Sequence, residues 1–255
     1  MAGEPYIDPA AQLGEGVRVG RFSVIGPRVR LGAGSVVADH CVVGEAATGA
    51  PLEIGPGALI RSFTALEEGS RIGPGFTTGH HVLVRAGCEI GVGVRIGTQT
   101  SLEGDVRIGD HVRLQGYSTF ADGTEIGDFA HVFPRVAVTN DPLPPSAAKL
   151  PVRIGDGAAI GTGAILLPGT RVGTGAFVSA GALVRGVVPD ASVVLSDGSP
   201  GGPVTHLAHL PAGITHPWMT HFTDPYPPEA LGRIEALRER VLAAARDVPR
   251  RQRTR

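Results

Sequence analysis

Three polar residues in the second half of the chain are suited to acid–base chemistry. His131 is followed nine and ten residues later by Asn140 and Asp141, in a stretch rich in proline. Because an imidazole exchanges a proton near neutral pH, His131 is a candidate general base. The amide of Asn140 and the carboxylate of Asp141 can orient a polar substrate through hydrogen bonds. These three residues form the first candidate site.

A second polar cluster lies earlier in the chain. His80 and His81 are adjacent, and Tyr117 lies 36 residues after His81 with Gln99 halfway between them. Two interpretations stay open for the histidine pair. It either contacts a distal part of an extended substrate, or it only caps a turn.

These residues are positioned by a six-residue repeat that runs through most of the chain. Every sixth residue is hydrophobic over residues 54–138, with Thr78 as the exception, and the same period covers residues 7–43 and 154–184. A helix needs an apolar residue about every 3.6 positions and an ordinary strand every second one, so neither explains 28 hexads. The period predicts a parallel β-solenoid in which each hexad forms a short strand and a tight turn.

The two cysteines, Cys41 and Cys88, occupy inward positions of this repeat. They are too few and too far apart for a disulfide framework or a cysteine-rich zinc site. An inward thiol behaves as a small core residue, so a covalent cysteine mechanism is disfavoured.

The hexad resembles the repeat of left-handed β-helix acyltransferases. Both consist of an aliphatic residue, glycine, two variable residues, a small residue and one further residue. Within that family, residues 78–85, 136–145 and 160–169 are similar to segments of sugar-nucleotide N-acyltransferases. The resemblance implies an all-β, left-handed parallel β-helix with three hexads in each triangular coil. The 28 hexads then give about nine coils.

The resemblance also implies an acyl-CoA-dependent N-acyltransferase. Such an enzyme moves an acetyl or related acyl group from a coenzyme A thioester to an amine of a small acceptor, here an amino sugar or a sugar nucleotide. The donor is acetyl-CoA or another acyl-CoA, with an acyl carrier protein as the alternative carrier, and no metal is required.

Roles follow for the candidate residues. His131 removes a proton from the attacking nitrogen, and Asn140 and Asp141 orient the acceptor. His80, His81 and Tyr117 are candidates for binding the distal part of the acceptor. Small residues that leave room for the pantetheine arm of the donor are Gly161, Thr162, Gly163, Gly173, Ala180 and Gly181.

The expected geometry separates these groups within one chain. His131 falls on a flat wall of the prism, whereas Asn140 and Asp141 fall at a different edge. A homotrimer brings the wall of one chain against the loop of the next, and the related acyltransferases are trimers that hold both substrates between subunits. The chain also departs from the bacillosamine and sialic-acid acetyltransferase branch, whose base histidine lies nine residues before His131. Asp122 stands there, so Asp122 is a second candidate for the base.

Three other functions compete with amine acylation. The first is O-acylation of a hydroxyl acceptor, and the second is a non-catalytic hexapeptide scaffold. The third is a metal enzyme that resembles the γ-type carbonic anhydrases, which need three histidines. Starting from His81, their spacing falls on Tyr117 and Asp122, so two of the three ligands are missing.

Two domains are expected. Residues 1–195 form the β-helix with a loop at 139–153, and residues 196–255 form a Gly/Pro-rich extension with Trp218, a helix over 229–247 and a basic tail. The net charge of −1 and the pI of 6.8 argue against general affinity for nucleic acid or an anionic membrane. Since there is neither a membrane-length apolar run nor a signal peptide, a cytoplasmic location is predicted.

Overall fold

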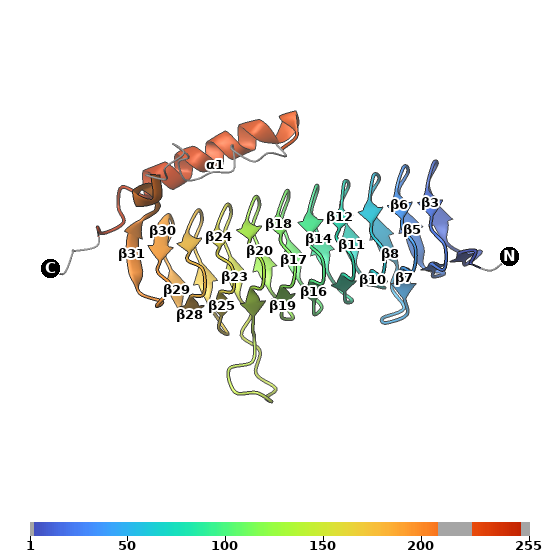
Figure 1. Ribbon diagram of the computed structural model, residues 1–255, viewed down its shortest axis with the longest axis horizontal. Coiled ribbons are helices and arrows are strands. Elements are labelled where there is room, and N and C mark those ends of the chain that lie inside the picture. The colour runs from blue at the N-terminus through green and yellow to red at the C-terminus, as the bar shows by residue number, and fades with distance from the viewer. Residues whose placement is uncertain (1–2, 209–225, 251–255) are drawn as a thin grey trace. The chain divides into compact units, whose positions relative to one another are not determined.

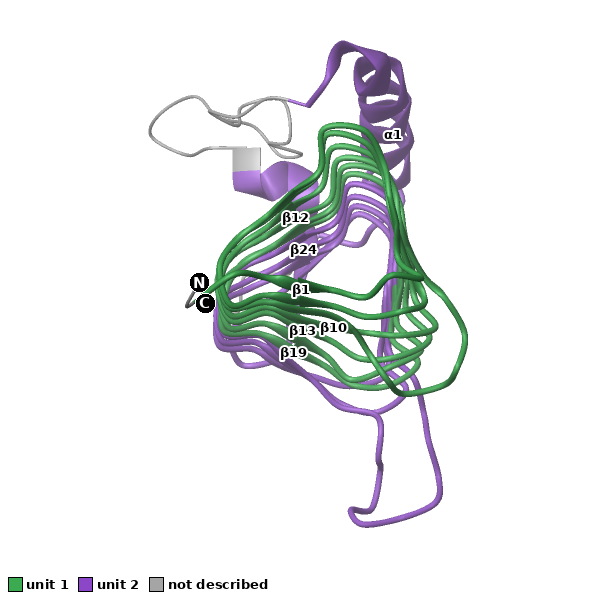
Figure 2. Cartoon of the chain, turned by 90° about the vertical axis from the view of Figure 1, so that its right-hand side faces the viewer, with its two compact units in different colours: residues 1–125 green, residues 126–255 purple. Residues whose placement is uncertain are grey.

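The chain forms a parallel β-helix of very short strands, which the computed structural model describes over residues 3–208 and 226–250 (Figure 1). Its contacts divide it into unit 1, residues 1–125, and unit 2, residues 126–255. Each coil of a solenoid contacts only adjacent coils, so this division inside the predicted domain 1–195 involves no change of fold. Within each unit the coils have a triangular outline when viewed along the helix (Figure 2).

Three parallel sheets, here named A, B and C, form the walls of each unit. Sheet A of unit 1 contains β1 (Tyr6–Ile7), β4 (Val24–Ile25), β7 (Val42–Glu45), β10 (Ala65–Glu67), β13 (Leu83–Val84), β16 (Ser101–Leu102) and β19 (Thr119–Phe120). Sheet B of unit 1 contains β2 (Gln12–Leu13), β5 (Val29–Leu31), β8 (Leu52–Ile54), β11 (Arg71–Ile72), β14 (Glu89–Ile90) and β17 (Arg107–Ile108). Sheet C of unit 1 contains β3 (Arg18–Val19), β6 (Val36–Val37), β9 (Leu59–Ile60), β12 (Thr77–Thr78), β15 (Arg95–Ile96) and β18 (Arg113–Leu114).

Unit 2 repeats the three walls, and β20 (Glu125–Ile126) falls at the boundary between the units. Its sheet A contains β22 (Ala137–Val138), β25 (Ile165–Leu166) and β28 (Leu183–Val184), and its sheet B contains β23 (Arg153–Ile154), β26 (Arg171–Val172) and β29 (Val187–Val188). Its sheet C contains β21 (His131–Val132), β24 (Ala159–Ile160), β27 (Phe177–Val178) and β30 (Ser192–Val194), followed by the antiparallel β31 (Pro200–Pro203).

The interior of each unit is built from the hexad positions. Starters such as Ile60, Leu66 and Val84 are fully buried, and so are the small residues Ser23 and Cys41 at the second inward position. Burial of these side chains stabilises the prism, since strands of two residues have few backbone hydrogen bonds of their own. The predicted left-handed parallel β-helix is confirmed.

The number of residues between partners in neighbouring coils shows where the repeat is interrupted. Regular coils pair residues 18 apart, as in Ile72 with Ile90. The interval rises to 23 at Val43 with Leu66 and to 28 at Val138 with Leu166, so the two predicted insertions add five and ten residues.

A last coil is shorter than the others. In it the interval falls to 16, because Val172 pairs with Val188 and Val178 pairs with Val194. Since β1 to β30 supply three strands per coil, there are about ten coils, one more than the hexads predict. The repeat missed this coil because Val188 follows Val184 by four residues, which shifts the rest of the coil out of the register of six.

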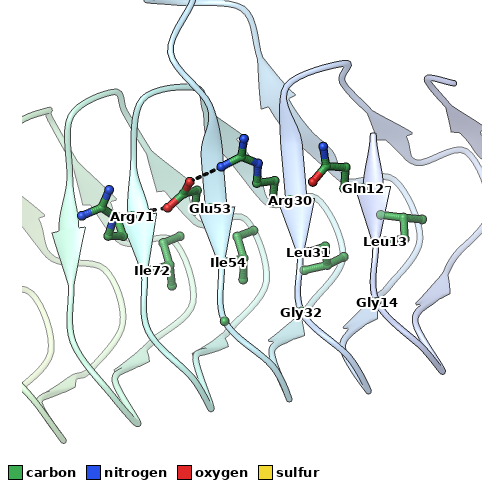
Figure 3. Close-up of a pocket in the computed structure, with 11 residues that line it drawn as sticks. Gln12, Leu13, Gly14, Arg30, Leu31, Gly32, Glu53, Ile54, Arg71 and Ile72 are labelled. Atoms are coloured by element: carbon green, nitrogen blue, oxygen red, sulfur yellow. Dashed lines mark hydrogen bonds and ion pairs between the residues drawn. The ribbon is translucent and has the colours of Figure 1, made fainter. Parts of the chain in front are cut away.

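The outer surfaces of the walls in unit 1 differ in charge. Sheet B alternates in charge, and its Glu53 pairs with Arg30 at 2.6 Å and with Arg71 at 3.3 Å across a shallow groove of about 640 Å³ (Figure 3). Such exposed ion pairs contribute little stability, so this wall suits contact with solvent. The first outward residue of each sheet A strand is uncharged: Tyr6, Val24, Val42, Ala65, Leu83, Ser101 and Thr119. Charge on this wall is found at the ends of β7 and β10, where Glu45 and Glu67 stand, and Glu67 pairs with Arg85 at 3.6 Å.

The described part of the C-terminal extension packs on unit 2. It contains η1 (Val204–Ala208), η3 (Pro228–Ala230) and α1 (Leu231–Ala244), so the helix is shorter than the predicted 229–247. Ile234, Leu237 and Val241 of the predicted apolar stripe are buried, whereas Leu231 is half exposed. Trp218 lies outside the described residues. No helix in the described residues is long and apolar enough to cross a membrane.

Candidate functional site

His131 lies on the outer surface of sheet C in unit 2, where it is almost completely covered. It begins β21, and the outward column in which it stands continues through Ala159, Phe177 and Val193. The His131 ring stacks on Phe133 with their centroids 4.4 Å apart and their planes inclined by 8°. Only 7% of His131 is exposed to solvent. The repeat predicts an outward position, but it does not predict this burial.

The cover over this column comes in part from the C-terminal extension. Phe177 and Val193 belong to a cluster with residues of η1, η3 and α1: Val204, Ala230, Ile234, Leu237 and Val241. At Gly175, on the corner before β27, an added Cβ would come within 2.6 Å of Val241 Cγ1, so the helix sits directly against the β-helix. The wall that carries His131 is therefore largely apolar and sheltered from water.

Four of the six residues predicted to contact the donor line one exposed corner of unit 2, between sheets C and A. Gly163 and Gly181 have φ of +71° and +72°, and the space where a Cβ would point is empty to 4 Å. Thr162 and Ala180 flank them, and Gly181 N donates to Thr162 O at 2.8 Å. A corner of this kind exposes backbone to an extended ligand.

The other two predicted donor contacts are explained by the packing of coils. A Cβ at Gly161 would lie 2.5 Å from Ala180 N, and a Cβ at Gly173 would collide with the backbone and carboxylate of Asp190. Gly173 also stands at a different corner, between sheets B and C. Glycine is required at both positions whether or not a ligand binds.

The loop that carries Asn140 and Asp141 leaves unit 2 between sheets A and B. Asn140 is buried, and its carbonyl accepts from Leu150 N at 2.7 Å, which closes the base of the loop. The Asp141 carboxylate accepts from Ser146 N at 2.7 Å, from the Ser146 hydroxyl and from Leu143 N at 3.0 Å. The hydrogen bonds from the Ser146 side chain and backbone hold the pKa of Asp141 below its usual value. Asp141 therefore shapes the loop through its ionised carboxylate.

The structure brings some of the predicted residues of unit 2 together and separates others. His131 precedes the corner between sheets C and A, and Phe133 N donates to Ile160 O one residue before Gly161. The candidate base and the donor corner thus share one edge of the unit. Asn140 and Asp141 stand at another corner, so the structure does not join them to His131 within one chain.

In unit 1, His81 belongs to a ladder of stacked rings that runs along the corner between sheets C and A. Phe22, His40, Phe63 and His81 stack in order, with centroids 4.8, 5.0 and 4.7 Å apart and planes within 9° of parallel. All four residues are exposed and have positive φ, a conformation that bulky residues rarely adopt. The sequence alone singles out His81 as a candidate. It does not reveal that Phe22 and His40 stand at the same corner, because the five-residue insertion shifts their spacing from His81.

The other candidates of unit 1 are found at turns. Tyr117, with φ of +63° and 57% exposure, continues the same corner beyond Gln99. His80 is exposed beside the ladder, and its N–H donates to Thr98 Oγ1 at 3.3 Å. Asp122 stands in the half-exposed turn after β19. The turn position of His80 and His81 agrees with either interpretation of the pair.

Thr78, the polar exception among the hexad starters, has a structural explanation. It is buried, and its hydroxyl accepts from Arg61 N at 2.9 Å and lies 3.4 Å from the hydroxyl of Thr64. A buried hydroxyl with hydrogen-bond partners needs no ligand to account for it.

Both cysteines are buried and free, as their hexad positions predict. Burial raises the pKa of the Cys41 thiol, and it raises the pKa of the Cys88 thiol to about 11. Only the thiolate is a good nucleophile, so neither residue suits covalent catalysis at neutral pH.

A thiol-labelling experiment checks this conclusion. At pH 8 we expect the native protein to react with an aromatic disulfide at least about 10²-fold more slowly than the same chain in denaturant, because the thiolate fraction is small and access is blocked. Stopping the reaction at set times and counting labelled cysteines by mass measures both rates. Rapid labelling of Cys88 in the folded protein would contradict its placement in the core.

The described residues contain no group of three or more His, Cys, Asp and Glu side chains that could hold a metal ion.

Comparisons with known proteins agree with the repeat and the fold. The family model described as "Bacterial transferase hexapeptide (six repeats)" matches residues 10–45, and the model described as "Hexapeptide repeat of succinyl-transferase" matches residues 151–185. Comparison with curated protein sequences finds no match.

Solved structures with a similar fold include UDP-N-acetylglucosamine acyltransferase from Arabidopsis. It is 18% identical to this chain at a TM-score of 0.62, and the match covers 95% of this chain and 93% of the other. PerB from Caulobacter crescentus, in complex with CoA and GDP-perosamine, is 22% identical at a TM-score of 0.43, with 52% and 57% covered. AntD from Bacillus cereus, an N-acyltransferase mutant in complex with dTDP and coenzyme A, is 16% identical at 0.36, with 68% and 87% covered.

Repeat, walls and matches together define the class: this chain is a hexapeptide-repeat protein with the left-handed β-helix fold. Within that class it resembles the hexapeptide-repeat acyltransferases.

Proposed function

We propose that this protein transfers an acetyl or related acyl group from an acyl-CoA to an amine of a small acceptor, an amino sugar or a sugar nucleotide. The observation that carries the proposal is the edge of unit 2 where His131, sheltered on an apolar wall, adjoins the open backbone corner at Gly163 and Gly181. A proton acceptor beside an open backbone surface for an extended donor suits direct acyl transfer.

The proposed step needs no covalent enzyme intermediate. The acceptor nitrogen attacks the thioester carbonyl carbon, His131 takes the proton from that nitrogen, and the carbon–sulfur bond breaks. His131 then returns the proton to the departing sulfur, so that an amide and a free thiol result. Coenzyme A supplies the activated acyl group, and a backbone N–H group is proposed to stabilise the oxygen charge that develops.

A homotrimer completes this site in our proposal. Asn140 and Asp141 stand at another corner of the same unit, so a neighbouring chain has to supply the loop that orients the acceptor. The column of uncharged outward residues from Tyr6 to Thr119 on sheet A in unit 1 supports such packing between chains. His80, His81 and Tyr117 are proposed to contact the distal part of the acceptor.

Release of coenzyme A thiol tests the proposal directly. Purified protein is incubated with acetyl-CoA and a panel of amino-sugar nucleotides, and the acylated product is identified by mass. Product with an amine but not with the matching hydroxyl sugar supports N-acylation. If product forms only with the hydroxyl sugar, the enzyme is an O-acyltransferase. If no product forms with any acyl chain, carried by coenzyme A or by a carrier protein, a non-catalytic scaffold is favoured.

Asn140→Ala tests the acceptor role of the loop. The expected result is a KM for the acceptor raised about tenfold, with a KM for acetyl-CoA within twofold of wild type, because one hydrogen bond to the acceptor is lost. Gln12→Ala, which removes an exposed amide from sheet B of unit 1, is the control. An acceptor KM and acceptor preference identical to wild type would reject the assignment of Asn140.

A further inference from the structure

A second pocket lies at the C-terminal end of the β-helix in unit 2, and the proposed reaction does not use it. Its volume is about 560 Å³, within the range of small-molecule sites. Three inward valines from the last parallel strands of the three walls line it: Val184 of β28, Val188 of β29 and Val194 of β30. The pocket is thus the end of the apolar core of the prism.

The walls of the pocket offer few free hydrogen-bonding groups. Backbone groups of the turn between β30 and β31 form hydrogen bonds within the turn. Leu195 N donates to Ser199 O at 2.9 Å, and Gly198 N donates to Leu195 O at 2.9 Å. The Asp197 carboxylate accepts from Ser199 N at 2.9 Å and from the Ser199 hydroxyl at 2.6 Å. Ser192 donates its hydroxyl to Pro189 O. Apart from a contact with the one cationic side chain of the lining, Arg185, a ligand inside this pocket gains by burying apolar surface.

One residue of the pocket breaks the pattern of its wall. The outward column of sheet B in unit 2 runs from Arg153 to Arg171 and then to Val187. Val187 is 73% exposed, so a large apolar surface stands where the wall otherwise carries charge. Val248 and Pro249, which follow α1, also line the pocket and extend its apolar surface.

One residue that lines the pocket has a positively charged side chain. Arg185 lines it, is exposed, and forms no ion pair with any residue in the described parts of the chain. The Asp197 carboxylate accepts its described hydrogen bonds from Ser199 in its own turn. Arginine binds carboxylates in a bidentate manner, which gives an anionic group a definite place at this pocket.

We propose that this pocket binds an unbranched aliphatic carboxylate of about six to ten carbons. The hydrocarbon chain packs on Val184, Val187, Val188 and Val194, and the carboxylate pairs with Arg185. The pocket binds its ligand whether or not the protein transfers acyl groups, so this site and the proposed function can fail separately.

Calorimetric titration with octanoate tests the site. We expect saturable binding of octanoate, at least tenfold weaker binding of octylamine because its charge is reversed, and at least tenfold weaker binding of butyrate because it buries less chain. Arg185→Gln should weaken octanoate binding about tenfold, and Val187→Asp should abolish it. The matched controls Arg171→Gln and Ile165→Asp, one coil earlier and outside the pocket, should stay within twofold of wild type.

Three results would overturn the proposal. They are the absence of octanoate binding, equal effects of the pocket variants and their controls, and displacement of octanoate by coenzyme A without an acyl group. The last result would make the pocket part of the donor cleft. Thermal unfolding of each variant checks that substitutions at these exposed positions leave the fold intact.

Discussion

Replacing His131 with alanine is expected to lower the turnover of acyl transfer about 10²-fold or more, because the amine then loses its proton without a positioned base. His131 is 7% exposed and stacks on Phe133, so its imidazole is held in one place on a sheltered wall. Turnover at saturating acetyl-CoA and acceptor measures the effect. The acidic limb of the pH–rate profile should disappear in the variant, which a purely structural role would not cause.

Two further variants separate the base from its alternatives. His206→Ala removes an exposed histidine of η1 in the same unit and should keep full activity. Asp122→Asn tests the other candidate base. If His131→Ala retains wild-type turnover while Asp122→Asn loses it, Asp122 takes the role of base.

The second large effect concerns the residue that holds the C-terminal helix in place. Phe129 is 2% exposed, and its ring meets Tyr226 edge to face at 5.5 Å and 88°. The Arg233 guanidinium of α1 lies over the same ring, 5.2 Å from its centroid, and also pairs with Asp128 at 2.7 Å. Phe129→Ala should therefore cost about 3–5 kcal/mol in the docking of α1, the usual range for a fully buried phenylalanine.

Amide hydrogen exchange of α1 measures the loss of docking free energy directly. A loss of about 3 kcal/mol should speed exchange of the α1 amides by roughly 10². Amides of β23 to β26 should be unaffected, because the β-helix keeps its own core. Phe22→Ala is a matched control, since Phe22 has the same φ of 59° but is 51% exposed. Equal effects of the two substitutions would show that the backbone and not the helix contact sets the result.

The consequence of Phe129→Ala for activity follows from the cover over sheet C. If the extension shelters the wall of His131, releasing α1 should lower acyl transfer while leaving acetyl-CoA binding largely unchanged. Unchanged turnover with a released helix would show that the shelter is dispensable.

The six-residue period determined the fold by itself. Inward residues such as Ile60 and Cys41 recur at fixed spacing, and each coil is held by contacts with the coils beside it, so local order in the sequence becomes order in space. The last coil escaped prediction for the same reason, because Val188 follows Val184 by four residues, so that Val188 and Val194 keep their place in the walls but fall out of the register of six.

Only the tertiary structure decided how the candidate residues are grouped and how far they are exposed. The cover over the column in which His131 stands comes in part from an extension more than 70 residues away in the chain. The ladder of Phe22 to His81 becomes visible only after the five-residue insertion is placed. Asp141 could be named from the sequence, but its bond to Ser146 depends on how the loop folds back. Periodic burial is a local property of the sequence, whereas the cover over a wall and the folding of a loop depend on contacts between distant segments that no period records.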